Sequence, residues 1–422
     1  MRIGLLVPQL VKEGGTERQV VRLAAELQTM GEDVTVFTSV VNPRTCYPDV
    51  TSRLNVVAAG RHPLATRLPS RRLADYLDMR RLAAAVAGPF DVLNPHHWPP
   101  HWAAAWVAGR AVQRPAVVWM CNDPPWRWGP AERPEALRAA GPFRRALRAL
   151  FLRYDLALVP RLDRTIVLSD YVRRIFEEVY GTPATVVRSG VDLAALDGER
   201  CRAAASSVRK AHGIGPKTFL LLSVNILMPQ RRVEDAVEAV GALLARGHDV
   251  HLLALGSTTY DPACAAGLRT LVRERGLEGR VTFTGSVPEA ELAAYYHACD
   301  AYVHPNEEQV WALAVTEAMA CGKPVVVSTG SAVHEVLSDG RDALLVPPRR
   351  PDAIADAVQR LLLNEMLRRR LASRGRRFVE RTLSWRRYAE SMMGVFEEAI
   401  AAQRDGRLGA ATAPRRDTAL VR

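Results

Sequence analysis

The sequence predicts an α/β protein of two doubly wound domains, each a parallel sheet covered by helices on both faces. Short aliphatic or β-branched runs alternate with helix-length segments along most of the 422 residues. The runs are almost continuously apolar, which is typical of parallel strands that are buried on both faces. Two such series flank one polar stretch, and each series is long enough for a domain of its own.

The first series begins at the amino terminus. Its expected strands lie at residues 3–7, 34–38, 91–93, 116–120 and 165–168, and its first expected helix lies at 16–30. The opening run lacks the longer apolar stretch and the small-residue cleavage site of a secretory signal peptide. We therefore expect a cytoplasmic protein, with at most peripheral contact with the inner face of the plasma membrane.

The second series follows a polar stretch at 193–217. Its expected strands lie at 219–224, 250–255, 281–284, 301–303, 324–328 and 343–346, with helices at 233–246, 289–298 and 315–321. A final amphipathic helix is expected at 384–403, because Trp385, Tyr388, Met392 and Phe396 share one stripe. We expect domains at 1–195 and 196–383, then this helix, then a disordered tail at 404–422.

The composition excludes several classes of protein. Hydrophobic residues make up 48% and charged residues 24% of the chain, as in ordinary soluble globular proteins. No run of about 18 apolar residues is present, so no membrane-spanning helix is expected. The six cysteines are scattered and form no CxxC pair, which argues against a disulfide framework or a zinc site.

The net charge is +12, and nearly all of the basic residues are arginines. Residues 1–195 hold 26 basic and 18 acidic side chains, so the excess is concentrated in the first half. A basic chain suits nucleic acid, an anionic membrane or a polyanionic small molecule. No nucleic-acid-binding module accompanies the charge, so we do not expect nucleic acid as a partner.

Two turns that join a strand to a helix have residues suited to bind an anion. Gly14 and Gly15 follow the first expected strand, where glycine lets a ligand approach the backbone and a helix N-terminus attracts negative charge. Arg231 and Arg232 occupy the same place in the second series and would hold a diphosphate through charge-assisted hydrogen bonds. The glycine turn matches neither GxGxxG nor a P-loop, and both turns could equally be ordinary connections.

The stretch at 305–324 is the most specific motif. It reads PNEEQVWALAVTEAMACGKP, and Glu317 is expected to open a helix of small and apolar residues. A carboxylate near a helix N-terminus stays ionised and can accept two hydrogen bonds, which fits a vicinal diol such as ribose. A purely structural glutamate is the alternative.

The order of these segments resembles the retaining glycosyltransferases of family 4, which have the GT-B fold of two facing Rossmann-like domains. The resemblance covers all but the tail, through segments at 14–15, 167–169, 187–192, 229–232, 281–285, 317–325 and 335–346. It implies transfer of a hexose from a nucleotide diphosphate sugar to an acceptor hydroxyl, with the anomeric configuration retained. It also implies that the last helix crosses back to the first domain.

The resemblance assigns roles to two residues of the 305–324 motif. Glu317 matches the glutamate that binds the ribose hydroxyls of the donor. Gln309 stands where the family has a glutamate that contacts the donor sugar. An amide still hydrogen-bonds sugar hydroxyls, but it carries no negative charge opposite a developing oxocarbenium ion.

The remaining donor-binding expectations also come from the resemblance. Ile226 and Arg231 stand where the family has the Arg and Lys that neutralise the diphosphate, and Arg232 is available to compensate for the lost arginine. The turn at Gly285 and Ser286 would meet the base through its backbone.

In the first domain, residues 91–96 match a D-V-x-H-x-H pattern in which the first histidine is replaced. The resemblance therefore makes His96 a catalytic candidate, with His97 and His101 as weaker ones. Asn122 stands where many members have a histidine facing the reaction centre. The expected catalytic residues are His96, Asn122 and Gln309.

The chain has no DxD pair, the usual carboxylate pair for a metal-bound diphosphate, so we expect transfer without a metal ion or other cofactor. GDP-mannose, UDP-glucose and UDP-N-acetylglucosamine are all compatible donors. No side chain is placed as an enzymic nucleophile, which favours a front-face route. Gln309 and Asn122 motivate the alternative of a non-catalytic nucleotide-sugar-binding subunit, while the 305–324 motif argues against an epimerase or phosphorylase on this fold.

The acceptor is expected at the first domain, as a glycan, glycolipid or lipid-linked molecule. A basic segment there carries Trp126, Trp128, Arg133, Arg138, Arg144, Arg145, Arg148 and Arg153. Apolar residues share one helical face opposite several of these arginines, namely Phe143, Ala146, Leu147, Leu150, Phe151 and Tyr154. Such a helix either lies on an anionic membrane surface or packs its apolar face into the core.

Overall fold

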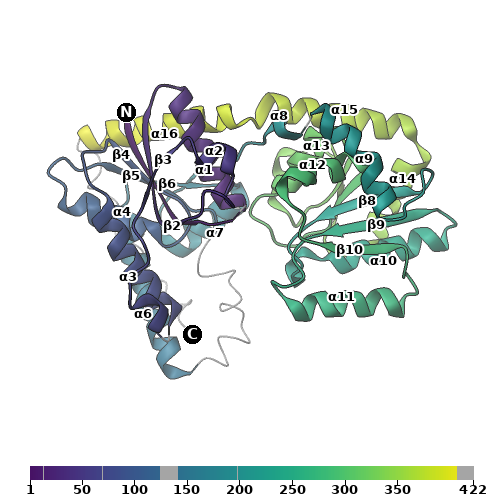
Figure 1. The fold of residues 1–422 in the computed structure, drawn as a ribbon, viewed down its shortest axis with the longest axis horizontal. Helices are drawn as coiled ribbons and strands as arrows, with labels where there is room; N and C mark the ends of the chain where they lie inside the picture. Colours follow the sequence, from purple (N-terminus) through teal and green to yellow (C-terminus); the bar gives the residue numbers. More distant parts are fainter. Residues whose placement is uncertain (13, 69, 124–140, 197, 406–422) are drawn as a thin grey trace. The chain divides into compact units, whose positions relative to one another are not determined.

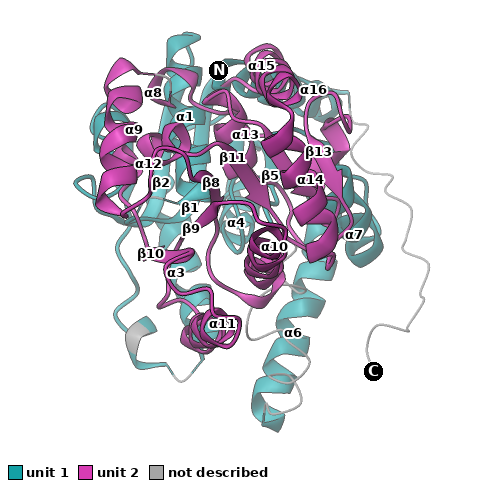
Figure 2. Ribbon diagram, turned by 90° about the vertical axis from the view of Figure 1, so that its right-hand side faces the viewer, with its two compact units in different colours: residues 1–188, 385–422 teal, residues 189–384 magenta. Residues whose placement is uncertain are grey.

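The computed structural model describes residues 1–12, 14–68, 70–123, 141–196 and 198–405, and the chain divides into two compact units (Figure 1). Unit 1 consists of Met1–Arg188 and Trp385–Arg422, and unit 2 of Ser189–Ser384 (Figure 2). The division falls at Arg188, a few residues before the expected boundary at 195. Most of the expected disordered tail, from residue 406 on, lies outside the described residues, as do Trp126, Trp128, Arg133 and Arg138.

The described part of unit 1 is built on a seven-stranded sheet with the order β3-β2-β1-β4-β5-β6-β7. All neighbouring strands run parallel; Ile3, for example, lies opposite Val34 on one side and Val92 on the other. The strands are β1 (Arg2–Leu10), β2 (Asp33–Val41), β3 (Asn55–Ala58), β4 (Val92–Pro95), β5 (Ala116–Met120), β6 (Arg164–Val167) and β7 (Thr185–Val186).

The helices of unit 1 begin and end where local chemistry favours it. In α7, the Ser169 hydroxyl accepts a hydrogen bond from Val172 N, and Gly181 ends the helix with φ 64°. The α-helices are α1 (Gly15–Thr29), α2 (Pro48–Thr51), α3 (Arg71–Ala85), α4 (Pro100–Arg110), α6 (Pro142–Leu158), α7 (Asp170–Tyr180) and α16 (Trp385–Arg404). Short 3₁₀ turns lie at Ala65–Arg67 (η1) and Val159–Arg161 (η3).

The described part of unit 2 is built on a six-stranded parallel sheet with the order β10-β9-β8-β11-β12-β13. Its central strands are buried along nearly their whole length, because helices cover both faces. The strands are β8 (Phe219–Val224), β9 (Val250–Leu255), β10 (Val281–Gly285), β11 (Ala301–His304), β12 (Val325–Ser328) and β13 (Leu344–Val346).

Helices of unit 2 pack against the apolar residues of these strands in more than one buried cluster. They are α8 (Leu193–Leu196), α9 (Glu199–Ala211), α10 (Val233–Ala245), α11 (Pro262–Glu274), α12 (Glu289–Ala298), α13 (Leu313–Ala320), α14 (Pro351–Leu363) and α15 (Glu365–Thr382). Short 3₁₀ turns lie at Pro229–Arg231 (η4) and Ala332–Val336 (η5).

The predicted fold class is confirmed, because both units are parallel sheets with covering helices. Two strands were not anticipated, β3 and β7. Both are short, lie at sheet edges and are only partly buried, so neither shows the continuous apolar run of a central strand. The last helix, α16, belongs to unit 1, where its stripe is buried and it contacts α1 and β5.

Each sheet changes winding direction beside its first strand, between β1 and β4 in unit 1 and between β8 and β11 in unit 2. At such a switch point the loops after neighbouring strands leave toward opposite faces and open a crevice at the carboxyl ends of the strands. Ligands of doubly wound proteins bind in this crevice. Each unit therefore has one position where a site is expected.

Candidate functional site

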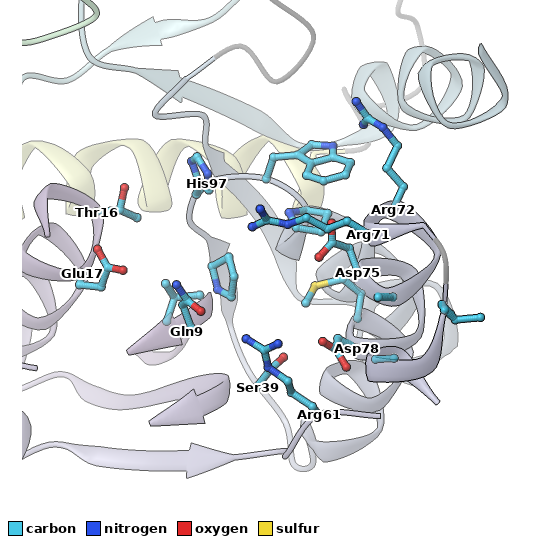
Figure 3. A pocket seen from close by; sticks show the side chains of 18 residues that line it. Gln9, Thr16, Glu17, Ser39, Arg61, Arg71, Arg72, Asp75, Asp78 and His97 are labelled. Carbon is cyan, nitrogen blue, oxygen red and sulfur yellow. The ribbon is translucent and has the colours of Figure 1, made fainter. Parts of the chain in front are cut away.

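A cavity of about 760 Å³ opens at the switch point of unit 1 (Figure 3). Pro8 and Gln9 of β1 line it, and so do Thr16 and Glu17 at the start of α1. The loop after β4 and the helix α3 complete the wall. The cavity thus lies where the strand order predicts a ligand.

Charged side chains of both signs line this cavity. Figure 3 shows Arg61 and Arg71 extending into it on the side of Asp75 and Asp78, with Gln9, Thr16 and Glu17 on the other side. Burial raises the pKa of Asp75 to about 6, although the charge of Arg71 opposes this rise. Such a site offers arginines to an anion and carboxylates to hydroxyl groups.

The loop after β4 is held by contacts to two other elements. His97 has φ 63°, and its carbonyl accepts a hydrogen bond of 2.8 Å from Trp119 Nε1 of β5. Trp98 Nε1 donates to Asp155 Oδ2 of α6 at 2.9 Å, and the guanidinium of Arg72 lies 5.4 Å from the Trp98 ring centroid. These contacts fix two cavity-lining residues, His97 and Trp98, to the body of unit 1.

The switch point of unit 2 holds a network of neutral polar side chains. Asn225 follows β8 and His304 ends β11. Asn306 Nδ2 donates to Asn225 Oδ1 at 2.8 Å and to Gln309 Oε1 at 2.5 Å. His304 Nε2 donates to the same Gln309 Oε1 at 2.7 Å. Burial lowers the pKa of His304 to about 3, so this histidine is uncharged at neutral pH.

This network leaves polar groups for a ligand. Because Gln309 Oε1 already accepts two hydrogen bonds, the amide NH₂ of Gln309 remains as its free donor. Four buried polar atoms around the network have no partner within the described residues, namely Asn306 Oδ1, Gln230 Oε1, Ser331 Oγ and Trp311 Nε1. Unpaired buried polar atoms are costly, and a cluster of them indicates a site that a ligand or water completes.

Two family models match the sequence. The model described as Glycosyltransferase Family 4 matches residues 13–195, and the model described as Glycosyl transferases group 1 matches residues 205–378. Together they account for most of the chain, one for each series of strands. The chain belongs to glycosyltransferase family 4.

Similar proteins support this membership. Phosphatidyl-myo-inositol mannosyltransferase of Mycobacterium leprae is 28% identical over 402 residues, which cover 94% of this chain and 96% of that one. D-inositol 3-phosphate glycosyltransferase of Actinosynnema mirum is 28% identical over 415 residues, or 92% of each chain. The crystal structure of Anabaena HepE in complex with UDP and glucose superposes with a TM-score of 0.75 at 17% identity, covering 94% and 100% of the chains. This likeness confirms the GT-B fold.

His96 of this glycosyltransferase is fully buried. Its Nε2 lies 2.7 Å from Asn94 Oδ1, and burial lowers its pKa to about 3. His96 is not among the residues that line the cavity. The neighbouring His97 lines the cavity instead, whereas His101 is buried against Asp155. The pattern that pointed to His96 thus lies next to the site without placing this side chain in it.

Asn122 lies at the end of β5 and is also buried. Its Nδ2 donates to Gln19 Oε1 of α1 at 2.6 Å. Asn122 Oδ1 and Gln19 Nε2 have no hydrogen-bond partner within the described part of the chain. This hydrogen bond joins the residues after β5 to α1. Each of the two side chains keeps one polar atom without a partner in the described part of the chain.

Gly14 caps the N-terminus of α1, next to Gly15. A Cβ on Gly14 would collide with the Glu17 carboxylate, and the Tyr47 hydroxyl donates to Gly14 O at 3.1 Å. Burial raises the pKa of Glu17, while nearby backbone and charged groups oppose the rise. A carboxylate of the chain itself therefore lies at the helix N-terminus that we expected to face the diphosphate.

The two arginines of the second turn have different partners. Arg231 Nη1 donates to Glu308 O at 3.3 Å, near the Gln309 network. Arg232 pairs with Glu234 and Asp235 at 2.7 Å each. Arg232 would have to share its charge between these two carboxylates and a diphosphate, and its role in compensating for the arginine missing at Ile226 stays a prediction.

Glu317 is the fifth residue of α13, so the expectation that it opens this helix is wrong. The helix begins earlier because Val315 N and Thr316 N already bond to Ala312 O. The Glu317 carboxylate is buried and accepts a hydrogen bond of 2.8 Å from the Tyr296 hydroxyl. Burial, reinforced by the charge of Glu317, raises the pKa of Tyr296 well above its usual value.

Gly285 ends β10 at the carboxyl edge of the sheet, and Ser286 follows it. Gly285 has φ 76°, a conformation that favours glycine, and its carbonyl accepts from Gly256 N at 2.9 Å. Ser286 is exposed. No group of three or more His, Cys, Asp or Glu side chains in the described ranges is arranged to hold a metal ion.

Several cavity residues were missed from the sequence, namely Arg61, Arg71, Arg72, Asp75 and Asp78. A local signal exists, because Arg71, Asp75 and Asp78 recur at helical spacing along α3 and share one face. That signal predicts an exposed charged face equally well. Only the position of α3 against the carboxyl end of β1 turns this face into a wall of the cavity.

Proposed function

We propose that this protein transfers a hexose from a nucleotide diphosphate sugar to an acceptor hydroxyl, with retention of the anomeric configuration. The neutral network around Gln309 carries the proposal, because it presents a free amide donor amid unpaired polar atoms at a switch point. The family membership supports sugar transfer as the chemistry. GDP-mannose, UDP-glucose and UDP-N-acetylglucosamine are the proposed donors.

On the donor side, each proposed role follows from the chemistry of one group. Glu317 would bind the ribose hydroxyls, and the amide of Gln309 would bind the transferred sugar. Arg231 would stabilise the charge on the leaving diphosphate, so transfer would need no metal ion. The backbone at Gly285 and Ser286 would meet the base.

The cavity of unit 1 is the proposed acceptor site. Relatives are named for phosphatidyl-myo-inositol and for D-inositol 3-phosphate, which share a cyclic polyol that carries a phosphate. Such an acceptor matches the lining, since Arg61 and Arg71 suit a phosphate and Asp75 suits ring hydroxyls. The volume of about 760 Å³ is typical of small-molecule sites. We therefore propose a phosphorylated cyclitol, free or lipid-linked, as the acceptor.

The proposed reaction follows a front-face route. The acceptor oxygen attacks the anomeric carbon as the bond from that carbon to the diphosphate oxygen breaks, and the leaving diphosphate takes the acceptor proton. The neutral amide of Gln309 would contribute hydrogen bonding and no charge to this transition state. Stabilisation would then come mainly from the groups that hold the leaving diphosphate, with Arg231 foremost.

The first test is a thermal-shift screen of nucleotide diphosphate sugars, followed by turnover with inositol 3-phosphate. A donor at 100 times its Kd is expected to stabilise the protein by about 2.7 kcal/mol. Product is expected with the α-configured linkage when the donor is α-configured, and the rate is expected to be the same with EDTA. Stabilisation without transfer or donor hydrolysis would instead favour the nucleotide-sugar-binding subunit.

Asp75→Asn is expected to change how acceptor binding depends on pH. Because the pKa of Asp75 is about 6, its carboxylate is ionised above that pH and accepts acceptor hydroxyls more strongly. The acceptor KM of the wild type should therefore rise as pH falls from 7 to 5, by about tenfold. The acceptor phosphate also titrates near pH 6, so both proteins share the step that it contributes. Asp75→Asn should have the higher KM at pH 7 and show only that shared step. A step of the same size in the variant and the wild type would contradict the role of Asp75.

Membrane contact through α6 is also proposed for unit 1. Phe143 and Leu150 are each 62% exposed, while Phe151 further along the helix is buried. In the first part of α6, apolar side chains lie at the surface together with Arg144, Arg145 and Arg148. In its second part, Phe151 and Asp155 are buried in unit 1. This supports peripheral contact with an anionic cytoplasmic membrane face. No helix within the described residues is long and apolar enough to cross a bilayer.

A further inference from the structure

The helix α15 of unit 2 carries a straight row of arginines on its outer face. Arg370, Arg374, Arg377 and Arg381 follow one another at intervals of four, three and four residues, which keeps them on one side of a helix. From the first to the last they span about 16 Å at 1.5 Å per residue. We call these four residues the arginine row; all four are exposed.

The charge of the arginine row is uncompensated within the described part of the chain. Other arginines of the same helix are paired, Arg369 with Glu365 and Arg376 with Glu380, each one turn away. No carboxylate of the described residues forms an ion pair with a member of the row. The row therefore presents an excess of positive charge to solvent.

A second face of α15, beside the row, holds the helix in place. Leu367, Leu371, Gly375 and Val379 are buried. A Cβ on Gly375 would lie 3.1 Å from Met319 Cε and 3.2 Å from Asp342 O, so the helix approaches the core of unit 2 closely. Figures 1 and 2 show α15 at the periphery of unit 2, and the four arginines of the row are exposed there.

A hollow lies at each end of the row. The first, of about 580 Å³, is lined by Leu363, Met366 and Arg370, and the two apolar side chains are 68% and 84% exposed. The second, of about 490 Å³, is lined by Arg374, Arg377 and Arg381, together with Arg341 and Asp342 from the loop before β13. Arg341 lies 3.9 Å from Asp342. One end is thus apolar and basic, and the other holds four arginines and one carboxylate.

We infer that this face of α15 docks on an anionic lipid bilayer. Lipid phosphates would occupy the arginine-lined hollow, and Leu363 with Met366 would enter the interface beside them. Arginines next to exposed apolar side chains are the combination that an anionic bilayer attracts, whereas nucleic acid makes no use of the apolar pair. The inference concerns unit 2 and stands whether or not sugar transfer is the activity.

The test measures co-sedimentation of the full chain with vesicles of 70% phosphatidylcholine and 30% phosphatidylglycerol. The variant Arg374→Gln/Arg377→Gln removes two charges from the row. The matched control Arg369→Gln/Arg376→Gln removes two charges from the same helix outside it. Each arginine near an anionic surface changes partitioning about fivefold, so the row variant should bind about 25-fold more weakly and the control less than twofold.

Further variants, vesicles and competitors distinguish docking on an anionic bilayer from a general effect of charge and from binding of other anions. Leu363→Ser/Met366→Ser should bind vesicles at low salt as the wild type does. In 0.5 M salt, where electrostatic attraction is screened, this variant should lose the vesicle binding that the wild type keeps. Equal losses in the row variant and its control would overturn the inference, because total charge would then explain both. So would equal binding to pure phosphatidylcholine, or binding that inorganic phosphate or a DNA oligonucleotide competes away fully. Thermal melting of each variant verifies that it is folded.

The helix α6 provides an independent comparison. Arg144→Gln/Arg145→Gln removes two charges from the surface proposed for unit 1. If this variant abolishes vesicle binding while the row variant binds as the wild type does, α15 is not a docking surface. Partial loss in each is the expected result.

Discussion

Glu317→Gln is expected to abolish the stabilisation that a nucleotide diphosphate sugar confers on the wild type. The carboxylate would accept hydrogen bonds from two ribose hydroxyls, and an amide can accept with only one atom. Hydrogen bonds to a charged group contribute about 1.5–3 kcal/mol each. Losing one to two of them lowers kcat/KM by about 10- to 10⁴-fold. Thermal shift with donor and steady-state kinetics measure both effects.

The structure supplies the control for this variant. The Tyr296 hydroxyl donates to Glu317 Oε2, and a glutamine at 317 still accepts that bond through its carbonyl oxygen. Glu317→Ala would leave the buried Tyr296 hydroxyl unpaired, at a cost of about 1–3 kcal/mol in folding free energy, and so would mix stability with binding. Tyr296→Phe removes the same contact and keeps the carboxylate, so it should still bind donor. Unchanged donor affinity in Glu317→Gln would assign Glu317 a purely structural role.

Gln309→Glu is expected to slow transfer and to make it depend on pH. A carboxylate at 309 would face His304 Nε2 at the position where Gln309 Oε1 now lies 2.7 Å away. An opposite charge so close favours the protonated histidine, so the pKa of His304 should rise from about 3 toward neutrality. Below the new pKa of His304, its imidazolium pairs with the carboxylate introduced at position 309. Above that pKa His304 is neutral, and the buried carboxylate has no opposite charge beside it.

The expected change is a fall in kcat/KM of about 10- to 100-fold at pH 8, since the amide donor is lost and a buried charge is introduced. The fall should be smaller near pH 6, while the wild type varies little at this site between pH 5 and 9. Gln309→Ala, which removes the amide without adding charge, should be slow and independent of pH. If Gln309→Glu is faster than the wild type at every pH, then the glutamine is not matched to His304.

The pattern of apolar residues along the chain was sufficient to predict the two sheets. Runs such as 219–224 and 250–255 are apolar at nearly every position, and only a strand covered on both faces accepts such a run. The stripe of Trp385, Tyr388, Met392 and Phe396 likewise predicted α16, because burial of one face of a helix requires that spacing. These predictions depend on local periodicity alone.

The same local patterns did not decide how individual side chains are placed. Residues 91–96 pointed to His96, which is buried, whereas the adjacent His97 lines the cavity, where the chain turns with φ 63°. Arg232 was expected to bind a diphosphate, and it pairs with two carboxylates at the start of α10. Neither placement changes the hydrophobic pattern, so the pattern could not predict it.

Sequence alone therefore determined the fold class, every described strand except the two edge strands β3 and β7, and the stretch of chain that holds Gln309 and Glu317. Tertiary structure alone decided which side chains meet. Asn225 and Asn306 are 81 residues apart and bond because β8 and β11 are neighbours in the sheet. The cavity of unit 1 likewise joins β1, α3 and the loop after β4. Burial of apolar surface follows local periodicity, whereas contact between polar groups follows strand order and register, which are long-range properties of the chain.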